Sequence, residues 1–170
     1  MELKVIRTQN NSRNCIICGM ENNLGLKAPF YNLEDNSVAS VFEFKSEHQS
    51  YPDRTHGGMV SALLDELMGR ALWTIEPDCF GVTTTLSITY RKPVPLNTKV
   101  KARAVITFNS MRGFTAKGAV YDLNDNLLIQ GEAKYFKIPF SKLFGIGTSQ
   151  HEEMCYEIPL NITQLNFPEL

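Results

Sequence analysis

The chain of 170 residues lacks the features that mark several protein classes. No apolar run approaches the roughly 18 residues that cross a bilayer as a helix, so we expect no membrane partner. The start, Met1–Arg7, has neither an apolar signal core nor a small-residue cleavage site, so we expect a cytoplasmic protein. The absence of internal repeats and low-complexity segments excludes repeat architectures and wholesale disorder.

Neither sign of charge is in excess, because 17 Lys and Arg stand against 18 Asp and Glu, for a net charge of −1. A nucleic-acid-binding domain is usually strongly basic, so we expect no nucleic-acid partner. Apolar residues make up 43% of the chain and charged residues 21%, as in an ordinary globular protein. The length fits one domain, with or without a tail.

Cysteine is scarce, and in a cytosolic chain we expect the four thiols to be reduced. Cys15 and Cys18, followed by Gly19, have the spacing of a metal knuckle or a redox pair. A zinc site usually needs a second pair of ligands, and none occurs at short spacing. The other candidate ligands are distant in sequence: His48, Cys79, His151 and Cys155. We therefore interpret Cys15 and Cys18 as structural and expect no metal.

Alternation of apolar and polar residues predicts most of the secondary structure. The predicted strands cover residues 38–44, 82–90, 99–108, 114–123 and 127–137. Asn124–Asn126 predicts a hairpin turn between the last two strands. Within 82–90, Leu86 and Ile88 fall on one face of the strand, and Thr83 falls on the other.

Only residues 59–73 show a helical period, with one wide apolar face. One long helix and an antiparallel sheet of five to six strands make an α+β layered fold. We place a single domain at 1–140, which includes an N-terminal segment at 1–30. Residues 141–170 have no clear period, and we interpret them as a tail that covers the domain or a partner subunit.

The segment directly before the helix contains Gly57 and Gly58, which are poor helix formers. Glycine leaves the backbone open to close approach, and a helix N-terminus offers free N–H groups and the positive end of a dipole. Such a site can stabilise a carbonyl oxygen that gains negative charge. On their own, the two glycines fit an ordinary loop-to-helix junction equally well.

Asp65 lies in a stripe of small residues, and no neighbour three or four positions away can pair with it. Glu66, by contrast, has Arg70 four residues on and predicts a surface ion pair. A solvated helix carboxylate remains the alternative for Asp65. Gly57 and Asp65 are about 12 Å apart along the helix, so one reacting carbon cannot touch both. Two antiparallel copies of the helix about a twofold axis can bring them together, so catalysis requires a dimer.

His56-Gly57-Gly58, with Asp65 nine positions after the histidine, resembles the hotdog-fold acyl-CoA thioesterases of the phenylacetate-pathway type. The resemblance extends to Cys15–Leu26 and to Gly81–Val94. It implies a sheet wrapped around one long helix, in which dimers join edge to edge with active sites at the interface. Many family members form tetramers.

The resemblance also implies roles for individual residues. The Gly57 N–H would polarise the thioester carbonyl, and Asp65 of the other subunit would act as general base or nucleophile. Thr83 would help to orient water. His56 would hydrogen-bond near the carbonyl, or would serve only to support the turn.

The resemblance also implies contacts with the substrate. It implies that CoA is part of the substrate and that there is no separate cofactor. Gly58 belongs to the open backbone, and Gln49 and Ser50 are candidates for the Asn or Gln that many relatives carry before the histidine. The candidate contacts for the CoA phosphates are Arg91, Lys92, Lys99, Lys101, Arg103 and Arg112, although each also fits a solvated strand-end charge. The candidate residues for the acyl pocket are Met59, Met68, Trp73 and Phe80.

Two other functions remain open. One is a non-catalytic acyl-CoA-binding or lipid-binding protein on the same fold. The other is a hotdog dehydratase, which usually pairs an Asp with a His for proton transfer at carbon. Because His56 precedes the helix and is followed by two glycines, the pattern favours a thioesterase.

Overall fold

Eight strands form one antiparallel sheet in the computed structural model, which describes residues 1–143 and 154–170. The strand order is β4-β7-β6-β5-β3-β2-β1-β8. The strands are β1 (Glu2–Gln9), β2 (Phe30–Leu33), β3 (Val38–Glu43), β4 (Cys79–Tyr90), β5 (Lys99–Asn109), β6 (Gly113–Tyr121), β7 (Leu127–Pro139) and β8 (Gln164–Asn166). The helices are η1 (Ser46–His48), α1 (Gly57–Arg70), η2 (Ala71–Thr74) and α2 (Phe140–Leu143).

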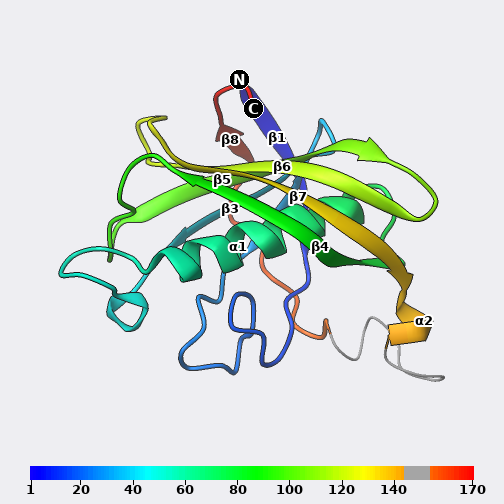
Figure 1. Cartoon of the computed structure of the whole chain (residues 1–170), viewed down its shortest axis with the longest axis horizontal. Coiled ribbons are helices and arrows are strands. Elements are labelled where there is room, and N and C mark those ends of the chain that lie inside the picture. The colour runs from blue at the N-terminus through cyan, green and yellow to red at the C-terminus, as the bar shows by residue number, and fades with distance from the viewer. Residues whose placement is uncertain (144–153) are drawn as a thin grey trace.

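The sheet curves over α1, so that the helix lies against its concave face (Figure 1). This arrangement confirms the predicted α+β fold with one long central helix. The predicted strands correspond to β3, β4, β5, β6 and β7, and the predicted helix corresponds to α1 with η2. No helix within 1–143 or 154–170 has the length and hydropathy that a membrane span requires.

The eight strands exceed the predicted five to six, and the sequence did not locate β1, β2 or β8. All four residues of β2 are buried, including Asn32, so no alternation of buried and exposed residues marks this strand. In β1, polar and apolar residues alternate only over the first four residues. β8 has only three residues, and it comes from the segment that we interpreted as a tail.

The end of the chain is packed on the domain. β8 pairs with β1, and the neighbouring Phe167 is 1% exposed in a small apolar cluster with Tyr121. Met154 is also buried. The remainder of the predicted tail, 144–153 with His151, lies outside the described residues.

The buried face of α1 fills the main core, with Leu63, Leu64, Leu67 and Met68 fully enclosed. Burial of each such side chain contributes about 1.5–3 kcal/mol. Gly118 makes room for Met68, because a Cβ at Gly118 would lie 3.0 Å from the Met68 side chain. Met68 is therefore a core residue, and its assignment to an acyl pocket was wrong.

Candidate active site

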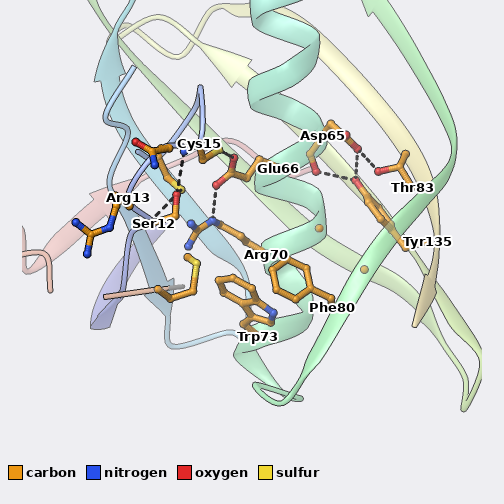
Figure 2. Close-up of a pocket in the computed structure, with 15 residues that line it drawn as sticks. Ser12, Arg13, Cys15, Asp65, Glu66, Arg70, Trp73, Phe80, Thr83 and Tyr135 are labelled. Carbon is orange, nitrogen blue, oxygen red and sulfur yellow. Dashed lines mark hydrogen bonds and ion pairs between the residues drawn. The ribbon is translucent and has the colours of Figure 1, made fainter. Parts of the chain in front are cut away.

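Two hydroxyl groups hold the Asp65 carboxylate through one oxygen (Figure 2). Thr83 Oγ1 donates to Asp65 Oδ1 at 2.8 Å, and Tyr135 Oη donates to the same oxygen at 3.1 Å. Tyr135 Oη also lies 2.8 Å from the Asp65 carbonyl oxygen. None of the ion pairs among the described residues includes Asp65, and no described donor reaches its Oδ2. The half-buried carboxylate is thus oriented but not neutralised.

Tyr135 is a site residue that the sequence did not reveal. Its ring is 4% exposed and stacks on Phe114, with centroids 4.6 Å apart and planes within 9°. Burial and the adjacent Asp65 charge raise the pKa of Tyr135 well above its ordinary value, so the phenol keeps its proton and donates. The only available signal is strand register, because Tyr135 lies opposite Thr83 across β4 and β7.

A β-bulge places Thr83 where it can reach Asp65. The register between β4 and β7 shifts between Thr83 and Thr85, which leaves Thr84 without an opposing residue. Thr83 then lies opposite Tyr135 and Leu86 opposite Ala133, both of them buried on the side of α1. The prediction that Thr83 faces away from Leu86 was wrong, because the extra residue of a bulge reverses the alternation.

Gly57 and Gly58 at the start of α1 differ in whether their N–H groups are already hydrogen-bonded. His56 is the N-cap residue, and its Nδ1 accepts the Gly58 N–H at 3.0 Å, so that amide is already used. No described residue accepts the Gly57 N–H. Tyr90 Oη donates to the Gly57 carbonyl at 2.9 Å and lies 2.5 Å from Ser61 Oγ. A Cβ at Gly57 would lie 3.2 Å from the Tyr90 ring, so glycine permits this close packing.

A cavity of about 570 Å³ opens beside Asp65 and Thr83. It follows the second half of α1 to the loop that contains Cys15. Trp73 and Phe80 line it, as predicted for an acyl pocket, and their rings meet edge to face at 5.3 Å. Met59 does not line it.

A second hollow, of about 310 Å³, lies at the other end of the site beside Gly57 and Tyr90. Arg91 and Lys92 line it, and both are exposed. Cationic side chains therefore stand next to the amide that opens the helix. This placement is compatible with the phosphate contacts expected of these two residues.

The remaining predicted contacts lie elsewhere. Arg112 sits in the turn between β5 and β6, at the end of the sheet where Gly113 and Phe136 pair, and so opposite to Arg91. Gln49 and Ser50 lie in the exposed loop before α1, where Gln49 forms a bridge with Thr55, and neither lines the two hollows.

Two of the basic candidates are structural rather than phosphate contacts. Lys101 is 6% exposed and pairs with Asp125 at 2.6 Å. Arg103 is 4% exposed and pairs with Asp35. Both cations are thus enclosed in ion pairs on β5.

Glu66 occupies the opposite side of the cavity from Asp65's partners (Figure 2). Arg70 Nε donates to Glu66 Oε1 at 2.9 Å, which confirms the predicted pair. Arg70 is only 3% exposed and lies between the rings of Phe30 and Trp73, so the pair is not on the surface. Cys15 Sγ donates to Glu66 Oε2 at 2.9 Å.

The four cysteines are free thiols. A hydrogen bond with Cys18, burial and the Glu66 charge together raise the pKa of Cys15 well above its ordinary value. The hydrogen bond from Cys15 holds the pKa of Cys18 below its ordinary value.

Comparison with known proteins shows which proteins share this architecture. The family model described as the thioesterase superfamily matches residues 54–129, which include α1, Asp65 and Thr83. A crystal structure of a thioesterase superfamily protein is 26% identical, with a TM-score of 0.67, and covers 72% of this chain and 63% of its own. Residues 54–129 are thus similar to the thioesterase superfamily, and the sheet around one helix is the hotdog fold.

Two further proteins are similar to parts of this chain. The mouse acyl-coenzyme A thioesterase THEM4 is 32% identical over 77 residues, which are 45% of this chain and 32% of that protein. This chain thus matches about a third of the length of that relative. The PaaI protein of the Escherichia coli phenylacetic acid degradation operon shares the fold, with a TM-score of 0.60 at 12% identity, over 66% of this chain and 80% of its own.

Proposed function

We propose that this chain acts as a homodimer that hydrolyses acyl-CoA thioesters. The observation that carries the proposal is the Asp65 carboxylate, fixed through Oδ1 by Thr83 and Tyr135 beside an apolar cavity. Its free oxygen can accept a proton from water or attack a carbon. The acyl-coenzyme A thioesterase relatives support the same chemistry.

The exposed edge of β4 supports a dimer. β4 has 12 residues and pairs with β7 on one side, and no described strand covers its other side. A long, uncovered edge strand is a template for pairing with another chain. Val82 and Tyr90 on this strand are 40% and 52% exposed, which leaves apolar surface for a partner to cover.

The contacts of α1 with β4 fix the register of such a dimer. Asp65 is bound to Thr83, and Gly57 is bound to Tyr90. We place the two helices on the same side of a joined sheet, with the two β4 strands antiparallel. With Thr84 omitted as the bulge residue, a twofold axis at Ser87 sets Thr83 opposite the partner's Tyr90. Asp65 then approaches the partner's Gly57.

This register also joins the two hollows. The cavity beside Asp65 meets the hollow that contains the partner's Gly57, Arg91 and Lys92. The acyl group would occupy the cavity, between Trp73 and Phe80, and the basic side chains would meet the CoA phosphates. The thioester would lie between the two, where the free amide and the carboxylate converge.

The chemistry follows from these positions. The Gly57 N–H donates to the thioester carbonyl oxygen and stabilises the negative charge that forms there, worth roughly 3 kcal/mol for one such donor. Asp65 takes a proton from water as the water oxygen bonds to the carbonyl carbon. The carbon–sulfur bond then breaks, and the thiolate leaves and is protonated. Alternatively, Asp65 bonds to the carbonyl carbon first, the carbon–sulfur bond breaks and the thiolate leaves, and water then hydrolyses the resulting anhydride to the free acid and regenerates Asp65.

Release of free thiol from a panel of acyl-CoAs tests the proposal. Asp65→Asn keeps the shape of the side chain and removes the base, so we expect kcat to fall about 10²–10⁴-fold. Asp78→Asn, at an exposed position after η2, is the matched control and should be unchanged. Equal rates for Asp65→Asn and the wild type would exclude Asp65 as base or nucleophile. Binding of acyl-CoA without any hydrolysis by the wild type would instead indicate a binding protein.

The other predicted roles belong to this proposal. His56 supports the turn as the N-cap residue and presents Gly57 to the carbonyl. Gly58, Gln49, Ser50 and Arg112 remain predicted substrate contacts. Light scattering measures whether the chains form a dimer or a tetramer. The same signal, recorded as the sample is heated, measures the thermal stability of the assembly.

A further inference from the structure

Three potential metal ligands meet on the opposite side of the cavity from the Asp65 site. The sulfur atoms of Cys15 and Cys18 and a carboxylate oxygen of Glu66 all lie within 4.8 Å of one another. The two cysteines come from the N-terminal loop, and Glu66 comes from α1. The interpretation of Cys15 and Cys18 as structural rested on the lack of further ligands nearby in sequence, and α1 supplies one.

The loop has the form of a metal knuckle. The Ile17 N–H donates to Cys15 Sγ at 3.3 Å, and the Ser12 N–H donates to Cys18 Sγ at 3.5 Å. Backbone donors of this kind stabilise thiolate sulfur. The Gly19 N–H closes the turn on the Cys15 carbonyl at 2.8 Å, and a Cβ at Gly19 would lie 2.4 Å from that oxygen. The turn therefore requires glycine immediately after the second cysteine.

We propose that Cys15, Cys18 and Glu66 bind one Zn²⁺ ion, which pins the N-terminal loop to α1. Zinc takes thiolate sulfur at about 2.3 Å and carboxylate oxygen at about 2.0–2.2 Å in a tetrahedron, so its ligand atoms lie about 3.5–3.8 Å apart. All three atoms lie within 4.8 Å of one another, so shifts of about 1 Å bring them to these separations. Cys15 Sγ and Glu66 Oε2, now 2.9 Å apart, would separate by less than about 1 Å.

The fourth position faces the cavity. Cys15, Cys18 and Glu66 all line the same cavity of about 570 Å³ as Asp65. A water molecule in the cavity can complete the tetrahedron, because the three protein ligands all approach from its wall.

The positive charge of Arg70 does not prevent metal binding, and its contact with Glu66 orients that ligand. Its guanidinium contacts Glu66 Oε1, which leaves Oε2 for the metal (Figure 2). Two thiolates and one carboxylate bring three negative charges, which Zn²⁺ and the guanidinium together balance. A hydrogen-bonded partner behind a ligating carboxylate is the usual outer shell of a metal site. Binding replaces the protons of both thiols, Cys15 and Cys18, which are released to solvent.

Metal titration of the full-length protein tests this site. The chain is purified under reducing conditions, stripped with a chelator, and titrated with Zn²⁺ and with Co²⁺. We expect one ion per chain by elemental analysis and a sulfur-to-cobalt charge-transfer band in the Co²⁺ form. Cys15→Ser, Cys18→Ser and Glu66→Gln should each weaken binding tenfold or more. Cys79→Ser and Cys155→Ser are the matched controls and should bind as the wild type does.

A ligand exchange keeps the test independent of folding. Cys18→His supplies nitrogen in place of sulfur, so it should still bind Zn²⁺ while the charge-transfer band of the Co²⁺ form weakens. Circular dichroism verifies that each variant is folded. Failure of the wild type to bind, a Co²⁺ spectrum without the sulfur band, or unchanged binding by folded Cys15→Ser would overturn the proposal. Thiol release from acyl-CoA is not part of this test, so either proposal can fail without the other.

Discussion

Asp65 and Glu66 are adjacent carboxylates on one helix that meet opposite environments. Asp65 accepts hydrogen bonds from two neutral hydroxyls on the sheet. Glu66 contacts a buried guanidinium and a thiol from the N-terminal loop. Because consecutive helix residues point about 100° apart, elements distant in sequence select the partners of each. The contacts of Glu66 all lie within one chain, whereas the proposed function requires a second chain to bring an oxyanion donor to Asp65.

The largest expected effect concerns that missing partner. Ser87→Cys places two thiols opposite each other on the proposed twofold axis, so mild oxidation should convert nearly all of the protein to a cross-linked dimer. Residues directly opposite in an antiparallel pair have Cα atoms about 4.5–5.5 Å apart, which suits a disulfide. A non-reducing gel measures the fraction that is cross-linked.

The controls for this cross-link are cysteines placed two positions before and after Ser87, on the same face of β4. Thr85→Cys and Thr89→Cys would each lie about 13 Å from their own copies, too far for a disulfide. The wild type, with its four native thiols, shows the background. Cross-linking of Thr85→Cys in preference to Ser87→Cys would refute the register and with it the approach of Asp65 to the partner's Gly57.

Substitution of the two carboxylates should affect the stability of the fold differently, and Glu66→Gln should be the more destabilising. The substitution leaves Arg70, which is 3% exposed, without its counter-charge, and the loss of a partner from a buried pair costs about 3 kcal/mol. We expect a clear fall in melting temperature without added metal. Asp65→Asn is the natural comparison, because it removes no ion pair and should melt close to the wild type. A smaller loss for Glu66→Gln than for Asp65→Asn would reverse the contrast between the two sides.

The sequence predicted most of the elements but few of the contacts between them. Alternation and helical period located α1 and five of the eight strands, and the spacing from His56 to Asp65 indicated the candidate site. Tyr135 was missed because its approach to Asp65 depends on the register of β4 with β7. Thr83 was assigned to the wrong face because nothing local in 82–90 announces a bulge. The contact of Glu66 with Cys15 was missed for a similar reason, since Glu66 lies on a helix 51 residues away in sequence.

Tyr135→Phe tests the hydroxyl side of the comparison with a smaller change. The ring can still stack on Phe114, but Asp65 Oδ1 loses one of its two donors. A hydrogen bond to a charged group contributes about 1.5–3 kcal/mol, so we expect kcat for thioester hydrolysis to fall roughly tenfold or more, with KM little changed. Tyr121→Phe, buried in the second apolar cluster, is the control. An unchanged kcat would mean that Thr83 alone positions the carboxylate.

Asp35, like Glu66, is a carboxylate that pairs with a buried cation. We expect its substitution to have the smallest effect. Burial raises the pKa of Asp35, but hydrogen bonds from Ser37 and the charge of Arg103 outweigh it and hold the pKa below its ordinary value. A carboxyl whose pKa is lowered on folding contributes stability above its unfolded pKa and loses it as the pH falls through the folded pKa. Asp35→Asn should therefore cost about 1 kcal/mol at neutral pH, and the cost should shrink in acid.

Melting temperatures of Asp35→Asn and the wild type, measured at neutral pH and at a series of acidic values, give this difference directly. Asp53→Asn serves as the control, because its side chain is exposed and forms none of the ion pairs of the described residues. A gap between Asp35→Asn and the wild type that stays constant into acid would show that the Arg103 contact stabilises the fold through packing instead of charge. Asp35 would then no longer resemble Glu66, whose buried partner acts through its charge.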